Sequence, residues 1–436
     1  MELGALCLIL ASVFVWGAFS ARAAAISTPI FFVATGLVMS EGLKLFEVES
    51  DPHVIKVVAE VTLVWVLFAD ASRVRIADLR ADEGRYARLL GLGLPMTVAL
   101  GAVAAIVVLG VDPWYALLLG AALAPTDAAL GSAVMSDRRL PRRVRHTLNV
   151  ESGLNDGIAT PIVTVAIVGI ATQSGLQSED AGSAVIGLLL GVAVGMAAGA
   201  GGGALLRIAR RRGWSSDEFA GPAVLALALL AYLGAVALDA NGFVAAFVGG
   251  SAYSAYVGRG GEKEVYYVEQ TCGLASMIAW FVFGSVIVPT LAAHWTWQVV
   301  VYAVLSLTVI RMLPVALALI GSHMDSKTVL FIGWFGPRGL ASIVFALIAL
   351  EDLHGAPGPI NEVVGAIGFT ILLSVLAHGL SARPLAGRYA ASRTEGPDRE
   401  SQHPEPTVRR LVSQTKGGSR SWSRGRESLP ASDQEP

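Results

Sequence analysis

Apolar stretches recur along this chain of 436 residues at close to the length that crosses a lipid bilayer. Val98–Leu109, Ile158–Ile170 and Val224–Leu238 are examples, and with their flanks they approach the roughly 20 residues that a spanning helix needs. Only 15% of the residues are charged, whereas a soluble domain carries about 25%. The charged surface that a large soluble domain needs is missing from all but the end of the chain. We therefore predict a membrane protein with many spans.

The apolar stretches predict thirteen membrane-spanning segments. They lie near residues 3–20, 25–40, 53–71, 87–110, 114–135, 147–172, 182–206, 220–238, 242–257, 269–289, 295–320, 328–350 and 361–386. All should be helical, because lipid cannot satisfy the polar groups of an open strand edge. The first segment has no basic leader and no evident cleavage signal, so we interpret it as a retained span. The predicted fold class is an all-α polytopic membrane protein.

Basic residues alternate from one connecting loop to the next, and this alternation predicts the orientation. Lys and Arg gather in the loops at 22, 73–88, 138–145, 207–212, 259–263 and 327. The alternate loops hold only Lys44 and Lys56 among several acids. Because basic residues favour cytoplasmic loops, we expect the N-terminus outside and the C-terminus in the cytoplasm of a cell membrane. The net charge of −2 does not suggest a nucleic-acid partner, and Cys7 and Cys272 do not suggest a disulfide framework or metal site.

The composition of the chain changes at about Gly387. From there on Ser, Pro, Glu and Arg dominate, and the few apolar residues cannot bury a core. We predict a transmembrane domain over residues 1–386 and a disordered cytoplasmic tail over residues 387–436. A regulatory tail and a merely solvated one both fit this composition.

The sixth predicted span begins with a polar run, Glu-Ser-Gly-Leu-Asn-Asp-Gly at 151–157. Ionisable residues inside a membrane are costly, so each is a functional candidate. On a helix, Ser152 precedes Asn155 and Asp156 by three and four residues, so the three side chains share a face. Their oxygens could coordinate a hard monovalent cation, and Glu151 borders that face. The alternative is a capping cluster at a helix start, although Val144–Val150 leads into the run without a clear helix start at Glu151.

The fifth predicted span is interrupted by Pro125-Thr126-Asp127. Pro125 lacks a backbone donor and disfavours a helical conformation at Ala124. A helix broken in mid-membrane exposes carbonyls and a dipole end, which are ready ion ligands, and Asp127 would supply charge. A proline kink with Asp127 capping the next half-helix is the simpler interpretation, and both can hold together.

The twelfth predicted span contains three glycines and a proline in the run 333–339, which predicts a second interrupted helix. Arg338 keeps its charge and needs a partner in the membrane, for which Glu151 is the best candidate. Alternatively, Arg338 snorkels to the lipid headgroups. Arg311 also lies within a predicted span, and the sequence indicates no partner for it. Asp70, at the end of the third span, either joins the site or marks the cytoplasmic edge beside Arg73.

The two interrupted spans predict inverted repeats. Spans one to six would start outside and spans eight to thirteen inside, with the broken helix fifth in each half and span seven as a linker. Interrupted helices in matching positions of two halves are the best sequence pointer to the binding site of a transporter. We therefore predict two discontinuous helices that cross at a binding site.

The three motifs together resemble the first family of monovalent cation:proton antiporters, in its NhaP and sodium/proton exchanger branch. The resemblance rests on the run at 151–157, Pro-Thr-Asp at 125–127 and Gly-Pro-Arg-Gly at 336–339, and it covers residues 1–386. It implies the NhaA/NhaP-like antiporter fold and a homodimer that works by alternating access. Ala128 is a departure, because the family often has proline at that position.

The resemblance also implies roles for individual residues. A Na+ site would be built from Asp127, Asp156, Ser152 and the Thr126 carbonyl. Asn155 would stabilise this site. The resemblance also pairs Glu151 with Arg338 and matches Asp70 to an acidic position of the family.

These implications predict a secondary antiporter that exchanges Na+ or Li+ for H+ and needs no cofactor. Proton and cation would compete for Asp156 and Asp127. The presence of Asn155 in place of a second aspartate resembles the electroneutral branch, which exchanges one cation per proton. K+/H+ exchange at the same site is the alternative. A cation channel is more remote because no filter loop is present, and an enzyme is not expected because no catalytic motif appears.

Overall fold

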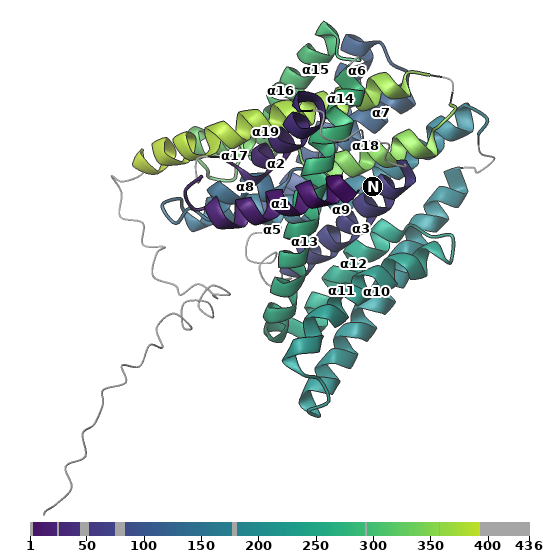
Figure 1. Cartoon of the computed structure of the whole chain (residues 1–436), viewed down its shortest axis with the longest axis vertical. Helices are drawn as coiled ribbons and strands as arrows, with labels where there is room; N and C mark the ends of the chain where they lie inside the picture. Colours follow the sequence, from purple (N-terminus) through teal and green to yellow (C-terminus); the bar gives the residue numbers. More distant parts are fainter. Residues whose placement is uncertain are drawn as a thin grey trace, which may run out of the picture. The chain divides into compact units, whose positions relative to one another are not determined.

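The computed structural model describes residues 3–23, 26–43, 52–74, 83–176, 181–292, 294–356 and 358–392. Every helix or strand assigned within these ranges is a helix, and Figure 1 shows how the helices are arranged. All thirteen predicted spans coincide with helices. The protein is therefore an all-helical multi-pass membrane protein, as predicted.

The first six predicted spans correspond to the following elements. They are α1 (Leu3–Phe19), α2 (Thr28–Leu37) with the π-turn η1 (Val38–Gly42), α3 (Pro52–Arg73), α5 (Glu83–Arg88) with η2 (Leu89–Gly93) and α6 (Leu94–Leu109), α7 (Pro113–Ala122) with α8 (Ala128–Met135), and α9 (Arg142–Gln173).

The other seven predicted spans follow in chain order. They are α10 (Ala181–Arg211), α11 (Asp217–Val236), α12 (Gly242–Val257) before η3 (Gly258–Gly261), α13 (Glu262–Val282) with η4 (Phe283–Ile287) and α14 (Val288–Ala292), α15 (Trp297–Leu307) with α16 (Val309–Ala318), α17 (Ser326–Trp334) with α18 (Leu340–Asp352), and α19 (Ile360–Ala391). Among the described residues, seven helical stretches are long and apolar enough to cross a membrane; several other spans are short or broken.

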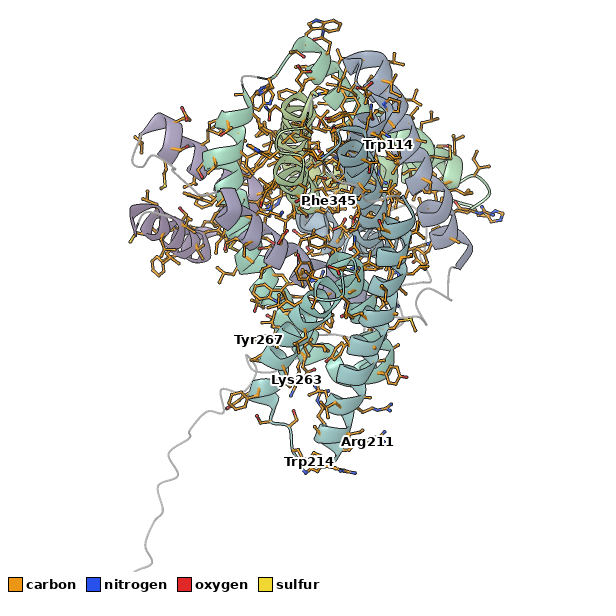
Figure 2. The ribbon with its side chains drawn as sticks, turned by 90° about the vertical axis from the view of Figure 1, so that its right-hand side faces the viewer. Trp114, Arg211, Trp214, Lys263, Tyr267 and Phe345 are labelled. Atoms are coloured by element: carbon orange, nitrogen blue, oxygen red, sulfur yellow. The ribbon has the colours of Figure 1, made fainter. Side chains whose placement is uncertain are left out.

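The helices pack through small residues and a large apolar core. A Cβ on Gly195 or Gly199 of α10 would overlap the backbone of α12, so the two helices can approach closely only because these residues are glycines. The glycine-rich stretch of α10 thus serves helix packing. Phe345 of α18 lies inside the helix bundle, whereas Arg211 and Lys263 lie together at one end of it (Figure 2). Two of the predicted basic loops therefore share one end.

The predicted tail begins too early. Helix α19 continues to Ala391, so residues 387–391 are helical, and residues 393–436 lie outside the described residues. Tyr389 explains the extension, because its ring stacks on Phe331 with 4.4 Å between the centroids and is 7% exposed. This ring contact and a hydrogen bond of 2.6 Å between the Tyr389 hydroxyl and Oγ1 of Thr328 hold the last turns of α19 against α17.

Both predicted interruptions are present, and they meet each other. The helix breaks between α7 and α8 at Pro125, and between α17 and α18 at Pro337. The backbone N–H of Asp127 donates to the carbonyl of Pro337 at 2.8 Å. The two extended segments therefore cross, and the four half-helices all end or begin at this point.

Candidate functional site

Asp127 holds the crossing together. Its Oδ1 accepts a hydrogen bond from the N–H of Leu130, in the first turn of α8, at 2.9 Å. Its Oδ2 accepts one from the N–H of Leu340, in the first turn of α18, also at 2.9 Å. A carboxylate is stabilised at a helix N-terminus by unsatisfied N–H groups and by the helix dipole. The predicted capping role is confirmed, and it extends to a second half-helix that the sequence did not indicate.

Two glycines of the run 333–339 make room for charged side chains. A Cβ on Gly339 would overlap the carboxylate of Asp127, and a Cβ on Gly336 would overlap the guanidinium of Arg311. These positions therefore need glycine because of what packs against them, in addition to the broken backbone that the sequence predicted.

Helix α9 carries the second half of the site. It begins at Arg142, so Glu151 lies well inside the helix and the alternative of a capping cluster is excluded. Ser152, Asn155 and Asp156 are all buried, and Asp156 is only 6% exposed. The prediction that Ser152, Asn155 and Asp156 lie on one helix is confirmed.

The glycines between these polar residues bring α9 close to other helices. Gly153 lies against the backbone carbonyl of Asp70 on α3, and the ring of Phe247 on α12 occupies the space beside Gly157. The aromatic ring covers α9 next to Asp156. The polar side chains of α9 thus face the crossing, while its glycines allow it to pack closely against α3 and α12.

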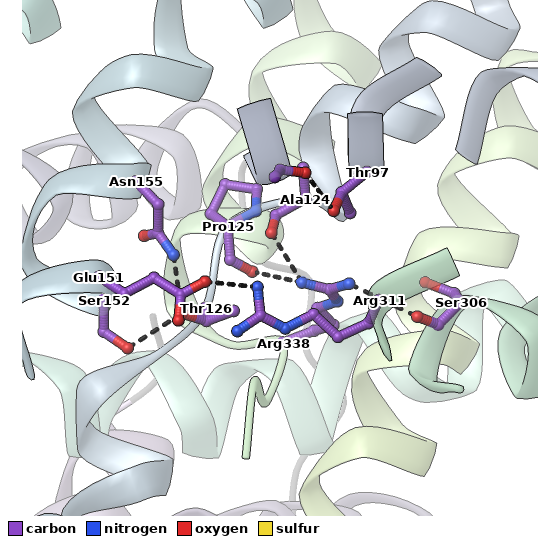
Figure 3. Close-up of polar contacts among 11 residues, drawn as sticks. Thr97, Ala124, Pro125, Thr126, Glu151, Ser152, Asn155, Ser306, Arg311 and Arg338 are labelled. Carbon is purple, nitrogen blue, oxygen red and sulfur yellow. Dashed lines mark hydrogen bonds and ion pairs between the residues drawn. The ribbon is translucent and has the colours of Figure 1, made fainter. Parts of the chain in front are cut away.

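Hydroxyl and amide groups connect α9 to the break after α7 (Figure 3). The side-chain Nδ2 of Asn155 donates to Oγ1 of Thr126 at 2.7 Å, and Oγ of Ser152 lies 2.9 Å from the same Thr126 oxygen. Oδ1 of Asn155 is buried and has no hydrogen-bond partner among the described residues. Ser152, Thr126 and Asn155 therefore lie together, and Oδ1 of Asn155 is available.

Asp156, like Asn155, has a buried side-chain oxygen without a hydrogen-bond partner among the described residues, but in Asp156 this oxygen belongs to a carboxyl group. Its Oδ1 is buried and accepts no hydrogen bond from any described residue. The charges of Asp70 and Asp127 are near enough to act on it. A buried acceptor without a donor is costly, and neighbouring negative charges increase that cost for the ionised form. This oxygen is therefore the atom at the crossing that most needs a proton or a cation.

Asp70 pairs with Arg73, as one of its two alternative predictions stated, and its membership of the cation site stays a prediction. Its Oδ1 accepts from Nη1 of Arg73 at 3.2 Å, and Arg73 also pairs with Glu269 of α13. Because the Asp70 charge also acts on Asp156, Asp70 belongs to the electrostatic surroundings of the crossing while it pairs with Arg73.

The predicted pair of Glu151 and Arg338 is wrong. Nη1 of Arg311 on α16 lies 2.6 Å from Oε1 of Glu151, and both side chains are buried (Figure 3). Arg311 is the second buried arginine, for which the sequence indicated no partner. The physical reason for the error is that Arg311 and Arg338 both enter the centre of the bundle, and their order along the chain does not tell which one faces Glu151.

Arg338 is held by backbone carbonyls instead. Its Nη1 donates to the carbonyls of Ala124 at 2.7 Å and Pro125 at 3.2 Å, and its Nη2 donates to that of Ser306 at 3.4 Å. A cation is favoured where a helix exposes its last carbonyls, as α7 does at its break. Arg338 is 0% exposed, so the snorkelling alternative is excluded.

Several polar residues that support the crossing were missed by the sequence analysis. Oγ of Ser374 accepts from the backbone N–H of Arg338 at 2.7 Å, and Nε2 of His378 lies 2.8 Å from the carbonyl of Trp334. Oγ of Ser342 donates to the carbonyl of Ala122 at 2.6 Å. Ser374 and His378 stand four residues apart in an apolar span, and that spacing is the signal that could have found them.

Comparison with known proteins identifies the family. The family described as "Sodium/hydrogen exchanger, transmembrane" matches residues 8–388. The chain is 28% identical over 358 residues to the K+/H+ antiporter NhaP of Alkalimonas amylolytica, covering 80% of this chain and 60% of that protein. It is 24% identical over 302 residues to a probable Na+/H+ antiporter of Schizosaccharomyces pombe, covering 61% and 39%. The chain thus spans only part of the length of these relatives.

The fold matches a solved structure as well. The sodium proton antiporter MjNhaP1 of Methanocaldococcus jannaschii superposes with a TM-score of 0.71 at 22% identity, over 88% of this chain and 97% of that one. The predicted resemblance in family and fold is confirmed by these matches. The chain belongs to the sodium/hydrogen exchanger family of membrane transporters, in the branch that includes the NhaP proteins.

Proposed function

We propose that this protein is a secondary antiporter that exchanges a monovalent cation for H+ at Asp156. The observation that carries the proposal is the buried, unpartnered Oδ1 of Asp156, which lies within range of the charges of Asp70 and Asp127. Membership of the exchanger family supports the same activity. The relatives named above are also described as cation/proton antiporters.

The exchange follows from competition for one group. Asp156 would bind either a proton or a cation, and Oγ of Ser152, Oδ1 of Asn155 and the Thr126 carbonyl would supply neutral oxygens for the cation. A charged carboxylate without compensation is expensive in apolar surroundings. The site would therefore cross between the two sides of the membrane only when it is loaded, which couples the two fluxes.

Asp127 has a different role in this mechanism. Both of its oxygens already accept a backbone N–H, but each carboxylate oxygen has a second lone pair. Asp127 would therefore face the cation as a fixed charge while it keeps the half-helices in place. Asp70 would contribute at longer range from its pair with Arg73.

The exchanged cation is proposed to be K+ first and Na+ second, which reverses the order predicted from the sequence. The NhaP of Alkalimonas amylolytica and the NhaP2 of Shewanella sp. (strain ANA-3), 25% identical over 360 residues, are both described as K+/H+ antiporters. The description of the family and that of MjNhaP1 refer to sodium, and this keeps Na+ as the second candidate.

The exchange is proposed to be electroneutral, with one cation per proton. The support is Asn155, a neutral residue beside Asp156 that donates to Thr126. The membrane potential is worth about 2.3 kcal/mol per charge per 100 mV, and it would then not drive the exchange.

The assembly and orientation are proposed from the sequence. The alternation of Lys and Arg supports an outer N-terminus and a cytoplasmic C-terminus in a cell membrane. The family resemblance supports a homodimer with a mobile core.

Exchange in proteoliposomes tests this proposal. Proton flux should be stimulated by K+, and by Na+ if the second candidate holds, and it should saturate with cation concentration. Asp156→Asn should reduce this flux to the rate of empty liposomes. Asp112→Asn is the matched control, because Asp112 is exposed and its side chain makes no capping hydrogen bond.

Three results would contradict the proposal. Normal exchange by Asp156→Asn would remove Asp156 from its central place. A cation current that needs no proton gradient would favour the channel. A rate that follows an imposed membrane potential would exclude electroneutral exchange, and Asn155→Asp is the variant in which such a dependence is expected.

A further inference from the structure

A groove of about 670 Å³ opens between α16 and α17, which pack against each other. Its walls are almost entirely apolar, and they include Val309, Leu313 and Ala316 of α16 and Val329 and Leu330 of α17. Leu313 is 46% exposed and Leu330 is 62% exposed. On α16, Val309 and Leu313 project from the face opposite Arg311, so the groove lies on the outer side of the helix that holds the buried ion pair.

The groove has the length of one membrane leaflet. It extends from Thr308, where the helix breaks between α15 and α16, to the loop that follows α16. The ten residues of α16 rise about 15 Å, which is half of the roughly 30 Å hydrocarbon core of a bilayer. Since Thr308 lies near the middle of the helical stretch Trp297–Ala318, the groove runs from mid-membrane to the membrane surface.

The surface end of the groove is rich in basic groups from different elements. Nη1 of Arg88 donates to the carbonyl of Ile320 at 2.7 Å, and Nη2 of Arg143 donates to that of Ser322 at 3.4 Å. His323 lines the groove, and Lys327 is exposed in the first turn of α17.

Asp325 is an acid at this end. Its Oδ1 accepts a hydrogen bond from Oγ1 of Thr328 at 2.6 Å. The three fixed positive charges of Arg88, Arg143 and Lys327 outnumber the negative charge of Asp325. An apolar channel one leaflet long that ends in an excess of positive charge is complementary to a lipid with an anionic headgroup.

We propose that this groove binds an anionic phospholipid. One acyl chain lies between α16 and α17, and the phosphate lies at Arg88 and Lys327. The lipid would contact the outer surface of α16, which positions Arg311. It would also contact the outer surface of α17, the half-helix that leads to Arg338. Binding there would stabilise the arrangement around the crossing. The binding itself does not depend on the proposed exchange activity.

Native mass spectrometry of the full chain in detergent tests the binding. The probes are dioleoyl phosphatidylglycerol, which is anionic, and dioleoyl phosphatidylcholine, which has the same acyl chains and no net charge. Phosphatidylglycerol should be retained as one tightly bound molecule and should raise the melting temperature by several degrees. Phosphatidylcholine should bind at least five-fold more weakly.

Variants separate the two parts of the groove. The double change Arg88→Gln and Lys327→Gln should reduce phosphatidylglycerol binding at least five-fold and leave phosphatidylcholine unchanged. Ala316→Phe should fill the groove and reduce the binding of both lipids. The matched control is Arg211→Gln with Lys263→Gln, which removes the same charge from exposed residues at the end of the bundle labelled in Figure 2.

The outcomes decide the proposal. Equal binding of the two lipids, or a control that loses as much binding as the Arg88 and Lys327 double variant, would show that no specific headgroup site exists here. Unchanged phosphatidylglycerol binding in Ala316→Phe would remove the acyl chain from the groove. If the double variant does not fold, Lys327→Gln alone should still weaken phosphatidylglycerol binding about two-fold, because this side chain is exposed and makes no hydrogen bond or ion pair with the described residues.

Discussion

Asp127 and Asp156 lie close together at the crossing, but their surroundings are opposite. Both oxygens of Asp127 accept a backbone N–H, one from each of two half-helices. Oδ1 of Asp156 accepts nothing from the described residues and is buried. Asp127 therefore holds the site together, whereas Asp156 lies within it with an oxygen that no described residue satisfies. Their contributions to stability and to exchange should therefore separate in experiments.

The two buried arginines show the same contrast. Arg311 neutralises Glu151 in an ion pair, whereas Arg338 binds the carbonyls that the helix breaks expose. An ion pair can be replaced as a pair, but carbonyls cannot be removed by mutation. We therefore expect the loss of Arg311 alone to have the largest effect on the free energy of unfolding.

Arg311→Met should destabilise the protein most. It leaves the charge of Glu151 buried without a partner, which costs about 3–5 kcal/mol. Adding Glu151→Met should recover most of that loss. Thermal unfolding in detergent measures both effects.

The matched pair is Arg338→Met with and without Glu151→Met. Here the second change should recover nothing, because the carbonyls of Ala124 and Pro125 stay unsatisfied. Better recovery in this pair than in the Arg311 pair would restore the pairing that the sequence predicted.

Gly339→Ala should be the next most harmful change. The new Cβ would overlap the Asp127 carboxylate and break hydrogen bonds to one or both half-helices, with a loss of about 2–3 kcal/mol. Gly273→Ala is the control, because no atom lies within 4 Å of the position of its Cβ. The same unfolding assay should show that the control is neutral or slightly stabilised. An equal loss of stability in the two variants would mean that the crowding at Gly339 is relieved without cost.

Asp127→Asn and Asp156→Asn test whether the two carboxylates contribute differently to stability. An amide keeps only one acceptor oxygen, so Asp127→Asn leaves the N–H of Leu130 or Leu340 without its partner and costs about 1–3 kcal/mol. Asp156→Asn removes a buried charge that has no donor and should leave the melting temperature unchanged or higher. A larger loss of stability in Asp156→Asn than in Asp127→Asn would contradict the different roles assigned to the two carboxylates.

Thr126→Val should have the smallest effect. It removes the acceptor of the Asn155 amide and the neighbour of Ser152, at a cost of about 1 kcal/mol. Because these groups are the proposed neutral ligands, the cation concentration for half-maximal exchange should rise several-fold. Thr126→Ser keeps the hydroxyl and should restore both values, and its failure to do so would assign the effect to the lost methyl group.

Features that depend on neighbouring residues could be predicted from the amino-acid sequence alone. Apolar length predicted the thirteen spans, Pro125 and the run 333–339 predicted both breaks, and helical spacing placed Ser152, Asn155 and Asp156 on one helix. These features depend on local backbone geometry and on the cost of polar groups in lipid. Both act within a few residues, so they can be recognised without knowing what packs against them.

The contacts between groups far apart along the chain could not be predicted in this way, because they depend on how the helices pack. Arg311 lies 160 residues from Glu151, and the Leu340 N–H that Asp127 caps lies 213 residues away. Such contacts depend on how each helix is rotated and where it crosses its neighbours, and two buried arginines look equivalent in the sequence. The same reason explains Tyr389, which extends α19 through its contact with Phe331. Packing, rather than local pattern, determined the partner of Glu151 and left Oδ1 of Asp156 without one among the described residues.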